Sequence, residues 1–285
     1  MRSVDERPDT PRAAYDLLPR TTTAVVVVLL LVAAGLGWAY TVREADSMTG
    51  MVTGLGQVGG GMTMAMASGA FMAMWAAMMV AMMAPTVAPV ALAHRAALRQ
   101  SAKPAALTGA FVVGFLLVWS AAGIVGLVAY RAVLELPASA ADSRWLPTAA
   151  GVVLAAVGVL QFSGHKLRCL RMCRAPRASV HDHAGTNLVT AFGAGLTHGW
   201  HCLGCCWALM VVLLIVGVMN LVWMAVIAAI FLLDKHWRRG EGLTRAVGAF
   251  FILLGVAVIV FPELLATISG VNTEGPLEMK GEMEM

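Results

Sequence analysis

Two histidines and three cysteines fall within nine consecutive positions of a long apolar stretch. They are His198, His201, Cys202, Cys205 and Cys206, in the run HGWHCLGCC. On an α-helix the first four lie within roughly 100° of one another, and Cys206 lies at the edge of that stripe. Imidazole and thiolate groups on one helix face can bind a single Cu(I) or Zn(II) ion. The spacing therefore predicts a soft-metal site within a helix.

Simple packing is the alternative explanation for this cluster. Free cysteine behaves as a small hydrophobic residue, and histidine is tolerated in the core of a helix bundle. Soft and ionisable side chains are nevertheless expensive at membrane depth, so a functional role is the default hypothesis for them there. Five such residues at this spacing favour the metal site. Haem ligation by His198 and His94 is less favoured, because two helices would have to place these rings opposite each other.

Methionine forms a second unusual pattern. Nine of the 19 methionines lie between Met62 and Met83. On a helix they form two stripes on nearly opposite sides, with Met72, Met79 and Met83 on one and Met74, Met78 and Met82 on the other. Thioethers select Cu(I) over harder divalent ions, which makes Met79, Met82 and Met83 ligand candidates of second rank. Ordinary packing is the alternative, with one stripe facing lipid or neighbouring helices.

A third group of candidate ligands lies in a basic segment. His165, Cys169 and Cys173 follow one another at intervals of four residues, so a continued helix places them on one face. Nearby cations, namely Lys166, Arg168, Arg171 and Arg174, favour the thiolate form of such cysteines. The pattern predicts a second, cytoplasmic ligand set, which His181 and His183 of the following loop could complete. The alternative is a basic juxtamembrane segment with two incidental cysteines.

The remaining polar residues of the apolar segments have simpler expected roles. His94 is expected to anchor the end of a helix at the membrane interface, after a kink at Pro85 and Pro89. Asn220 and Asp234, at the two ends of a short apolar run, are expected to be capping or interfacial residues. The methionines of the acidic tail, Met279, Met283 and Met285, are expected to belong to a plain solvated terminus.

Composition predicts an all-α, polytopic transmembrane helix bundle. Hydrophobic residues make up 59% of the chain and charged residues 13%, and apolar runs long enough to cross a bilayer recur. We expect about seven spans, near 22–40, 68–93, 105–130, 146–164, 188–216, 221–233 and 243–268. The sixth, at about 13 residues, is short for a crossing. The expected organisation is a cytoplasmic lead (1–21), one transmembrane domain (22–268) and an acidic, methionine-containing tail (269–285).

Charge distribution predicts the orientation. Basic residues concentrate in the segments 94–103, 165–187 and 235–245, whereas the intervening loops are neutral or acidic. The positive-inside rule then places the N-terminus in the cytoplasm and the C-terminus outside. These loops explain the net charge of +4, so the lipid bilayer is the expected partner and no nucleic acid is required. All five cysteines fall in the membrane or on the reducing side, which argues against a structural disulfide framework.

Three blocks of sequence resemble a family of bacterial predicted metal-binding integral membrane proteins, classified as a domain of unknown function. The blocks are MMVAMMAPTVAPVALAHR (78–95), HKLRCLRMCRAP (165–176) and HGWHCLGCCWALM (198–210), the last continuing through GVMNLVWM to Asp234 and Lys235. The resemblance implies a multi-pass protein of the bacterial cytoplasmic membrane with a metal site and no firmly assigned activity. His198 and His201 are not assumed to be features of the whole family.

The sequence thus favours Cu(I) handling, by binding, transfer or delivery to a membrane copper enzyme, with Zn(II) as the other candidate metal. Two alternatives stay open. One is a membrane thiol–disulfide oxidoreductase that uses the vicinal Cys205 and Cys206 with Cys202 as resolving thiol. The other is a non-catalytic accessory subunit that packs against other membrane subunits. Because no nucleotide-binding or hydrolase motif is visible, enzymatic activity is the less favoured reading.

Overall fold

The described part of the chain is entirely helical. A computed structural model describes residues 18–47, 68–98, 100–135, 145–174, 187–217, 220–237 and 239–269, and these ranges contain no strand. The helices are α2 (Arg20–Ser47), α3 (Ser68–Ala97), α4 (Pro104–Leu134), α5 (Trp145–Leu160), α6 (Gly164–Arg174), α8 (Leu188–Val216), α9 (Leu221–His236), α10 (Gly240–Val260) and α11 (Glu263–Ser269). The predicted all-α class is confirmed. The predicted lead and tail lie almost wholly outside the described residues, as do the glycine-rich segment 54–62, His181 and His183.

Five helices are long and apolar enough to cross a membrane: α2, α3, α4, α8 and α10. Helices α5 and α6 meet at a bend of 58° and make a sixth crossing if they form one broken span. Helix α9 has only 16 residues, in keeping with the short sixth span expected from the sequence. The structure therefore supports a membrane protein, and it does not confirm the count of seven.

Two predicted spans are divided in the structure. The fourth was expected to continue towards Cys173, but α5 ends at Leu160 and α6 starts afresh at Gly164. The last was expected to run to Ile268, but α10 ends at Val260 and α11 follows after Pro262. Phe261, directly before this proline, has a non-helical backbone (φ −122°, ψ 83°), since a following proline disfavours the helical conformation.

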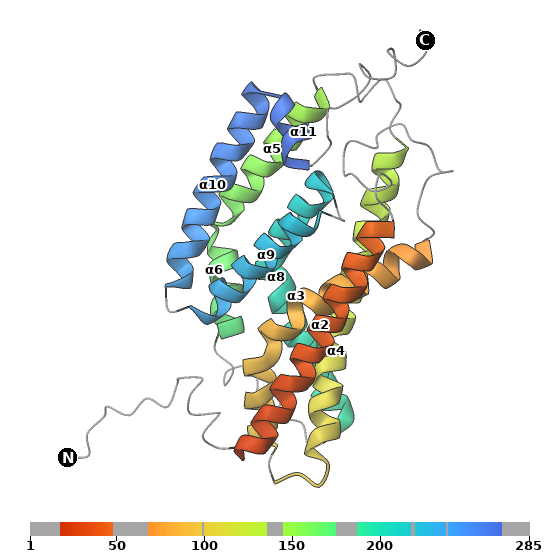
Figure 1. Cartoon of the computed structure of the whole chain (residues 1–285). Helices are drawn as coiled ribbons and strands as arrows, with labels where there is room; N and C mark the ends of the chain where they lie inside the picture. The colour runs from red at the N-terminus through yellow and green to blue at the C-terminus, as the bar shows by residue number, and fades with distance from the viewer. Residues whose placement is uncertain are drawn as a thin grey trace, which may run out of the picture.

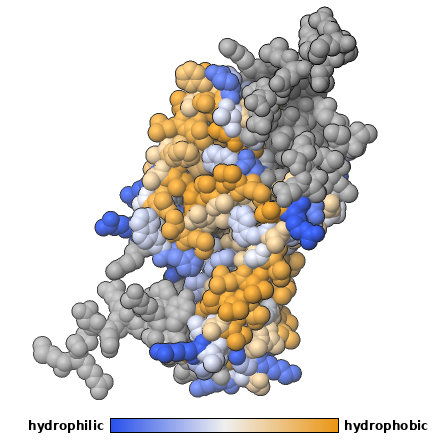
Figure 2. All heavy atoms as spheres, in the orientation of Figure 1, coloured by the Kyte–Doolittle hydropathy of each residue, from blue (hydrophilic) through white to orange (hydrophobic). Residues whose placement is uncertain are grey.

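The helices are arranged in two groups with α8 and α9 between them (Figure 1). On one side α3 packs against α2 and α4, and on the other α5 packs against α10. Helix α8 contacts α4, α5, α6 and α9. Large apolar side chains such as Leu36, Val125 and Leu253 point outward, and Figure 2 shows apolar residues over much of the visible surface, with hydrophilic ones at its lower end and also about halfway up. Such a surface suits helices that face lipid.

Glycines allow the closest helix contacts. A Cβ on Gly195 of α8 would collide with the backbone of Phe111 in α4, and one on Gly114 of α4 would collide with the backbone of Phe192 in α8. The pair Gly158 and Gly248 brings α5 and α10 together in the same way. Small residues at helix interfaces are typical of membrane proteins, because packing rather than hydrophobic burial drives association there.

Helix α3 lies at the centre of its group, and five of the six methionines in the two stripes are buried. Met74, Met78, Met79, Met82 and Met83 are each at most 1% exposed, and Met72 is half-buried. Of the two surroundings expected for a packed stripe, lipid or neighbouring helices, the five buried methionines have the second, because α2, α4 and α9 all contact this helix. Pro85 and Pro89 lie inside α3, which Figure 1 shows bent along its length.

The close contact of α4 with α8 predicts a position-specific loss of stability. We expect Gly195→Ala to lower the free energy of unfolding by about 1–3 kcal/mol, because the added methyl group overpacks against the Phe111 backbone. The matched control is Gly193→Ala on the same helix, since a Cβ on Gly193 meets no atom within 4 Å. Denaturant unfolding of the detergent-solubilised variants measures both changes. Equal stability of the two variants would contradict this packing.

Candidate metal centre

Four cysteine side chains come together between α6 and α8. The Cys205 Sγ atom lies 3.4 Å from the Cys206 Sγ atom and 3.9 Å from the Cys173 Sγ atom. The Cys205 thiol also donates to the Cys202 carbonyl oxygen at 3.1 Å. Cys202, Cys205, Cys206 and Cys173, hereafter the thiol cluster, are all buried and free of disulfides.

Helix α6 reaches the cluster because Gly204 leaves room for it. A Cβ at position 204 would lie 3.0 Å from the Cys169 Sγ atom and 3.5 Å from the His165 Nε2 atom. These two side chains contact each other at 3.7 Å. The sequence-based expectation of a separate cytoplasmic ligand set is therefore wrong for Cys173, because the bend before α6 folds this helix against α8.

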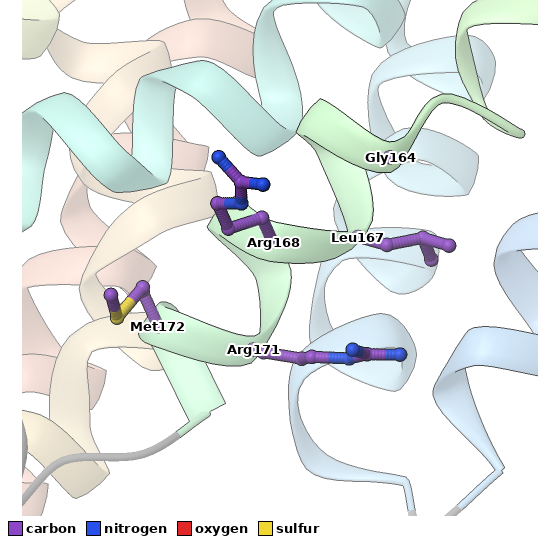
Figure 3. A pocket seen from close by; sticks show the side chains of 5 residues that line it. All are labelled: Gly164, Leu167, Arg168, Arg171 and Met172. Carbon is purple, nitrogen blue, oxygen red and sulfur yellow. The ribbon is translucent and has the colours of Figure 1, made fainter.

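The outer face of α6 is basic and hollowed. Gly164, Leu167, Arg168, Arg171 and Met172 line a hollow of about 390 Å³ (Figure 3). Arg171 forms an exposed ion pair with Glu241, at 2.9 Å between Nε and Oε1. The buried cysteines Cys169 and Cys173 are not among the residues that line this hollow. Helix α6 thus separates a cationic surface from the sulfur atoms behind it.

A lysine of α9 contacts the thiol cluster. The Lys235 ammonium donates to the Cys202 Sγ atom at 3.0 Å and to the Thr86 hydroxyl oxygen at 3.3 Å. Thr86 in turn donates to the Met83 carbonyl oxygen at 2.9 Å, and its hydroxyl lies 3.8 Å from the Met83 sulfur atom. Since a neighbouring cation favours the thiolate, Lys235 gives Cys202 an electrostatic environment unlike that of a plain packed thiol.

A second buried charge pair lies beside this lysine. Lys166 of α6 and Asp234 of α9 approach to 3.5 Å between Nζ and Oδ2, with both side chains about 5% exposed or less. Thr244 of α10 donates to the other carboxylate oxygen at 3.0 Å. The expectation of a capping or interfacial Asp234 is therefore wrong, because the folded α6 supplies a buried partner. Asn220 does cap α9, accepting from the Trp223 amide at 3.2 Å.

The histidines occupy different surroundings. His198 is buried, with its ring tilted against Phe111 and Phe115 at centroid distances of 5.9 and 5.7 Å, and its Nδ1 atom has no partner. His201 is half-buried, and its Nδ1 atom lies 2.8 Å from the Thr197 carbonyl oxygen. His94 is fully buried and stacks on Phe111 at 4.7 Å. The expectation of His94 as an interfacial anchor is wrong, because α3 and α4 enclose its ring.

The side chains do not form a finished metal site. Among the described residues, no three histidine, cysteine, aspartate or glutamate side chains are arranged to hold a metal ion. Met79, Met82 and Met83 are buried in the core, and Met83 is linked through Thr86 to Lys235.

Sequence reasoning missed the roles of Lys235, Lys166 and Thr86. One signal was available, since Asp234 and Lys235 end an apolar helix and ionisable residues at such positions need partners. The partners themselves lie up to 149 positions away in the chain, so only the fold reveals them.

A comparison with protein families identifies the class of protein that carries this cluster. Residues 72–258, more than half of the chain, match a family of copper chaperones, and this stretch contains every cysteine. The chain belongs to this family, PpoB2. No curated protein and no solved structure matches it. The family supports a copper-related function, in agreement with the copper reading of the sequence.

The contact between α6 and α8 predicts a specific cross-link. In a variant that keeps only Cys173 and Cys205, through Cys169→Ser, Cys202→Ser and Cys206→Ser, mild oxidation should join the two helices by an intramolecular disulfide. The sulfur atoms start 3.9 Å apart, and modest side-chain movement brings them to bonding distance. Mass spectrometry of non-reduced peptides detects the link. Additional replacement of Cys205 by serine is the control, and free thiols in the two-cysteine protein would contradict the arrangement.

Proposed function

We propose that this protein binds Cu(I) through the thiol cluster and passes it to other copper-handling proteins. The observation that carries the proposal is the approach of Cys205 to Cys206 and Cys173, at 3.4 and 3.9 Å between sulfur atoms. In a tetrahedral site, sulfur atoms bound to one zinc ion at about 2.3 Å lie about 3.8 Å from one another. The cluster is thus close to the size of a thiolate coordination sphere before any ion is bound.

The choice of Cu(I) rests on the chemistry of the donors and on the family. Thiolates and thioethers are soft ligands that select Cu(I), and membership of a copper chaperone family supports copper as the cargo. Cys202, Cys205, Cys206 and Cys173 are proposed as the primary ligands. His198, His201 and the methionines Met79, Met82 and Met83 are proposed as secondary ligands that become available when helices α3 and α8 adjust around the ion.

Exposure along α6 supports a route between the surface and the cluster. His165 is exposed, Cys169 and Cys173 are each 7% exposed, Cys205 and Cys206 are 2% exposed, and Cys202 is fully buried. The ligands on α6 recur every helical turn. An ion can therefore pass by ligand exchange from His165 and Cys169 to Cys173 and then to the cysteines of α8, without leaving sulfur or imidazole coordination. The reverse order releases it.

The proposed location is the bacterial cytoplasmic membrane, with α6 on the cytoplasmic side. Apolar side chains that point outward from α2, α4 and α10 support contact with lipid, and the arginines of α6 support the positive-inside orientation. Membrane copper enzymes, or other membrane subunits that receive copper, are the proposed partners. The protein would then act as a carrier and not as an enzyme.

Metal analysis tests the proposal. The protein purified under reducing conditions and loaded with Cu(I) should hold roughly one copper ion per chain. The variant Cys202→Ser, Cys205→Ser, Cys206→Ser should lose it, because hydroxyl groups are poor ligands for Cu(I). Trp207→Phe is the matched control, since Trp207 follows Cys206 on α8 and points outward. Mass spectrometry of bound metals is the measurement.

Other results would redirect the assignment. Stoichiometric zinc in place of copper would keep the site and overturn the Cu(I) assignment. The absence of bound metal in the wild-type protein, even after Cu(I) loading, would overturn the proposal. It would favour the thiol–disulfide oxidoreductase or the accessory subunit considered from the sequence.

A further inference from the structure

The ammonium group of Lys235, near the end of α9, contacts a buried cysteine. Lys235 is half-buried, yet its ammonium group turns inward to Cys202, which is fully buried, instead of outward to water. A charge directed away from water is costly unless an opposite charge compensates it. Lys235 therefore needs an anion close to its Nζ atom.

The carboxylate of the neighbouring residue, Asp234, already has two partners. Asp234 precedes Lys235, but its two oxygens are engaged by Lys166 and Thr244. Arg174 adds positive charge on the same side, with its Nε atom 3.4 Å from the Lys235 carbonyl oxygen. Among the described residues, the Lys235 ammonium donates to the Cys202 sulfur atom and to the neutral Thr86 hydroxyl. Cys202 is therefore the group that is placed to balance Lys235 when its thiol is ionised.

From this arrangement we infer that Lys235 is a built-in counter-cation that allows two of the four proposed cysteine ligands to bind one Cu(I) ion as thiolates without net charge. The inference rests on the proposed function and names a positioning residue for it. One monovalent ion and one ammonium cancel two thiolates, whereas without Lys235 a bis-thiolate complex leaves one negative charge buried. An uncompensated buried charge is strongly unfavourable, so the second thiolate would be lost.

Thr86 holds the ammonium in place. Its hydroxyl donates to the Met83 carbonyl, which leaves the oxygen free to accept from Lys235. The ammonium of this α9 residue consequently lies between α3 and α8, next to Cys202. From this position Lys235 can remain beside the sulfur atoms when the ion binds, since it needs no bond to the ion itself.

Substitution of Lys235 tests the inference. We expect Lys235→Leu, which removes the charge without adding a sulfur atom, to lower the affinity for Cu(I) by about 100-fold or more, and Lys235→Arg, which keeps the charge, to retain it within about tenfold. Competition with a chromophoric Cu(I) chelator measures the affinity. X-ray absorption of the copper-loaded proteins counts the sulfur ligands, which should fall from at least two in the wild-type and arginine proteins to one in Lys235→Leu.

A matched control removes the neighbouring buried ion pair. The double variant Lys166→Leu, Asp234→Leu eliminates an ammonium and a carboxylate between α6 and α9 while Lys235 stays, and it should keep the wild-type affinity and sulfur count. Gel filtration and thermal unfolding confirm that each variant is folded.

The possible outcomes separate the two proposals. Unchanged affinity and sulfur count in Lys235→Leu would overturn the counter-cation role and leave the copper function intact. An equal loss in Lys235→Arg or in the double control would also overturn it, because shape or general stability would then explain the effect. Failure of the wild-type protein to bind Cu(I) would instead overturn the proposed function.

Discussion

Charged groups that leave water must bring opposite charges with them, and this constraint organises the region where α6, α8, α9 and α10 meet. Lys166 and Asp234 join α6 to α9, and Thr244 ties the same carboxylate to α10. Lys235 joins α9 to the Cys202 sulfur of α8 and to Thr86 of α3. A single helix end, Asp234–Lys235, thus connects elements from four other parts of the chain, and it explains why α9 is held among them despite its short length.

The same constraint shapes the chemistry of the cysteines. A thiol packed among apolar residues is inert, but a thiol beside an ammonium group is favoured as the thiolate, the form that binds soft metals. The thiol cluster lies on the inner side of α6, whose outer side is basic. Gly204 makes this possible, because any larger residue there would press on Cys169 and His165 and push α6 away from α8. Small residues therefore permit the close contact of α6 with α8, and buried charges determine the electrostatic environment of the cysteines there.

Membership of a copper chaperone family supports a copper-related function for the protein that carries this arrangement. A chaperone has to bind its cargo tightly enough to exclude water and loosely enough to release it. The proposed ligands along α6, from an exposed histidine to buried cysteines, suit this demand, since each exchange would replace one soft donor by another. A rigid site would retain the ion, whereas no three histidine, cysteine, aspartate or glutamate side chains of the described residues are arranged to hold one.

The sequence by itself determined the class of protein and the residue types of the site. Long apolar runs with so few charges predict helices in lipid, because a helix satisfies its own backbone hydrogen bonds there. The spacing of His198, Cys202, Cys205 and Cys206 placed the soft side chains on one region of one helix, and local periodicity is sufficient to show this. Tertiary structure decided everything that depends on distant parts of the chain. In the folded protein α6 turns back so that Cys173 contacts Cys205. His94 and most of the methionines of α3 are buried there, and Lys235 contacts Cys202. Helical periodicity carries no information on which faces meet, since close approach depends on glycines such as Gly195 and Gly204 matching the shape of a partner far away in the sequence.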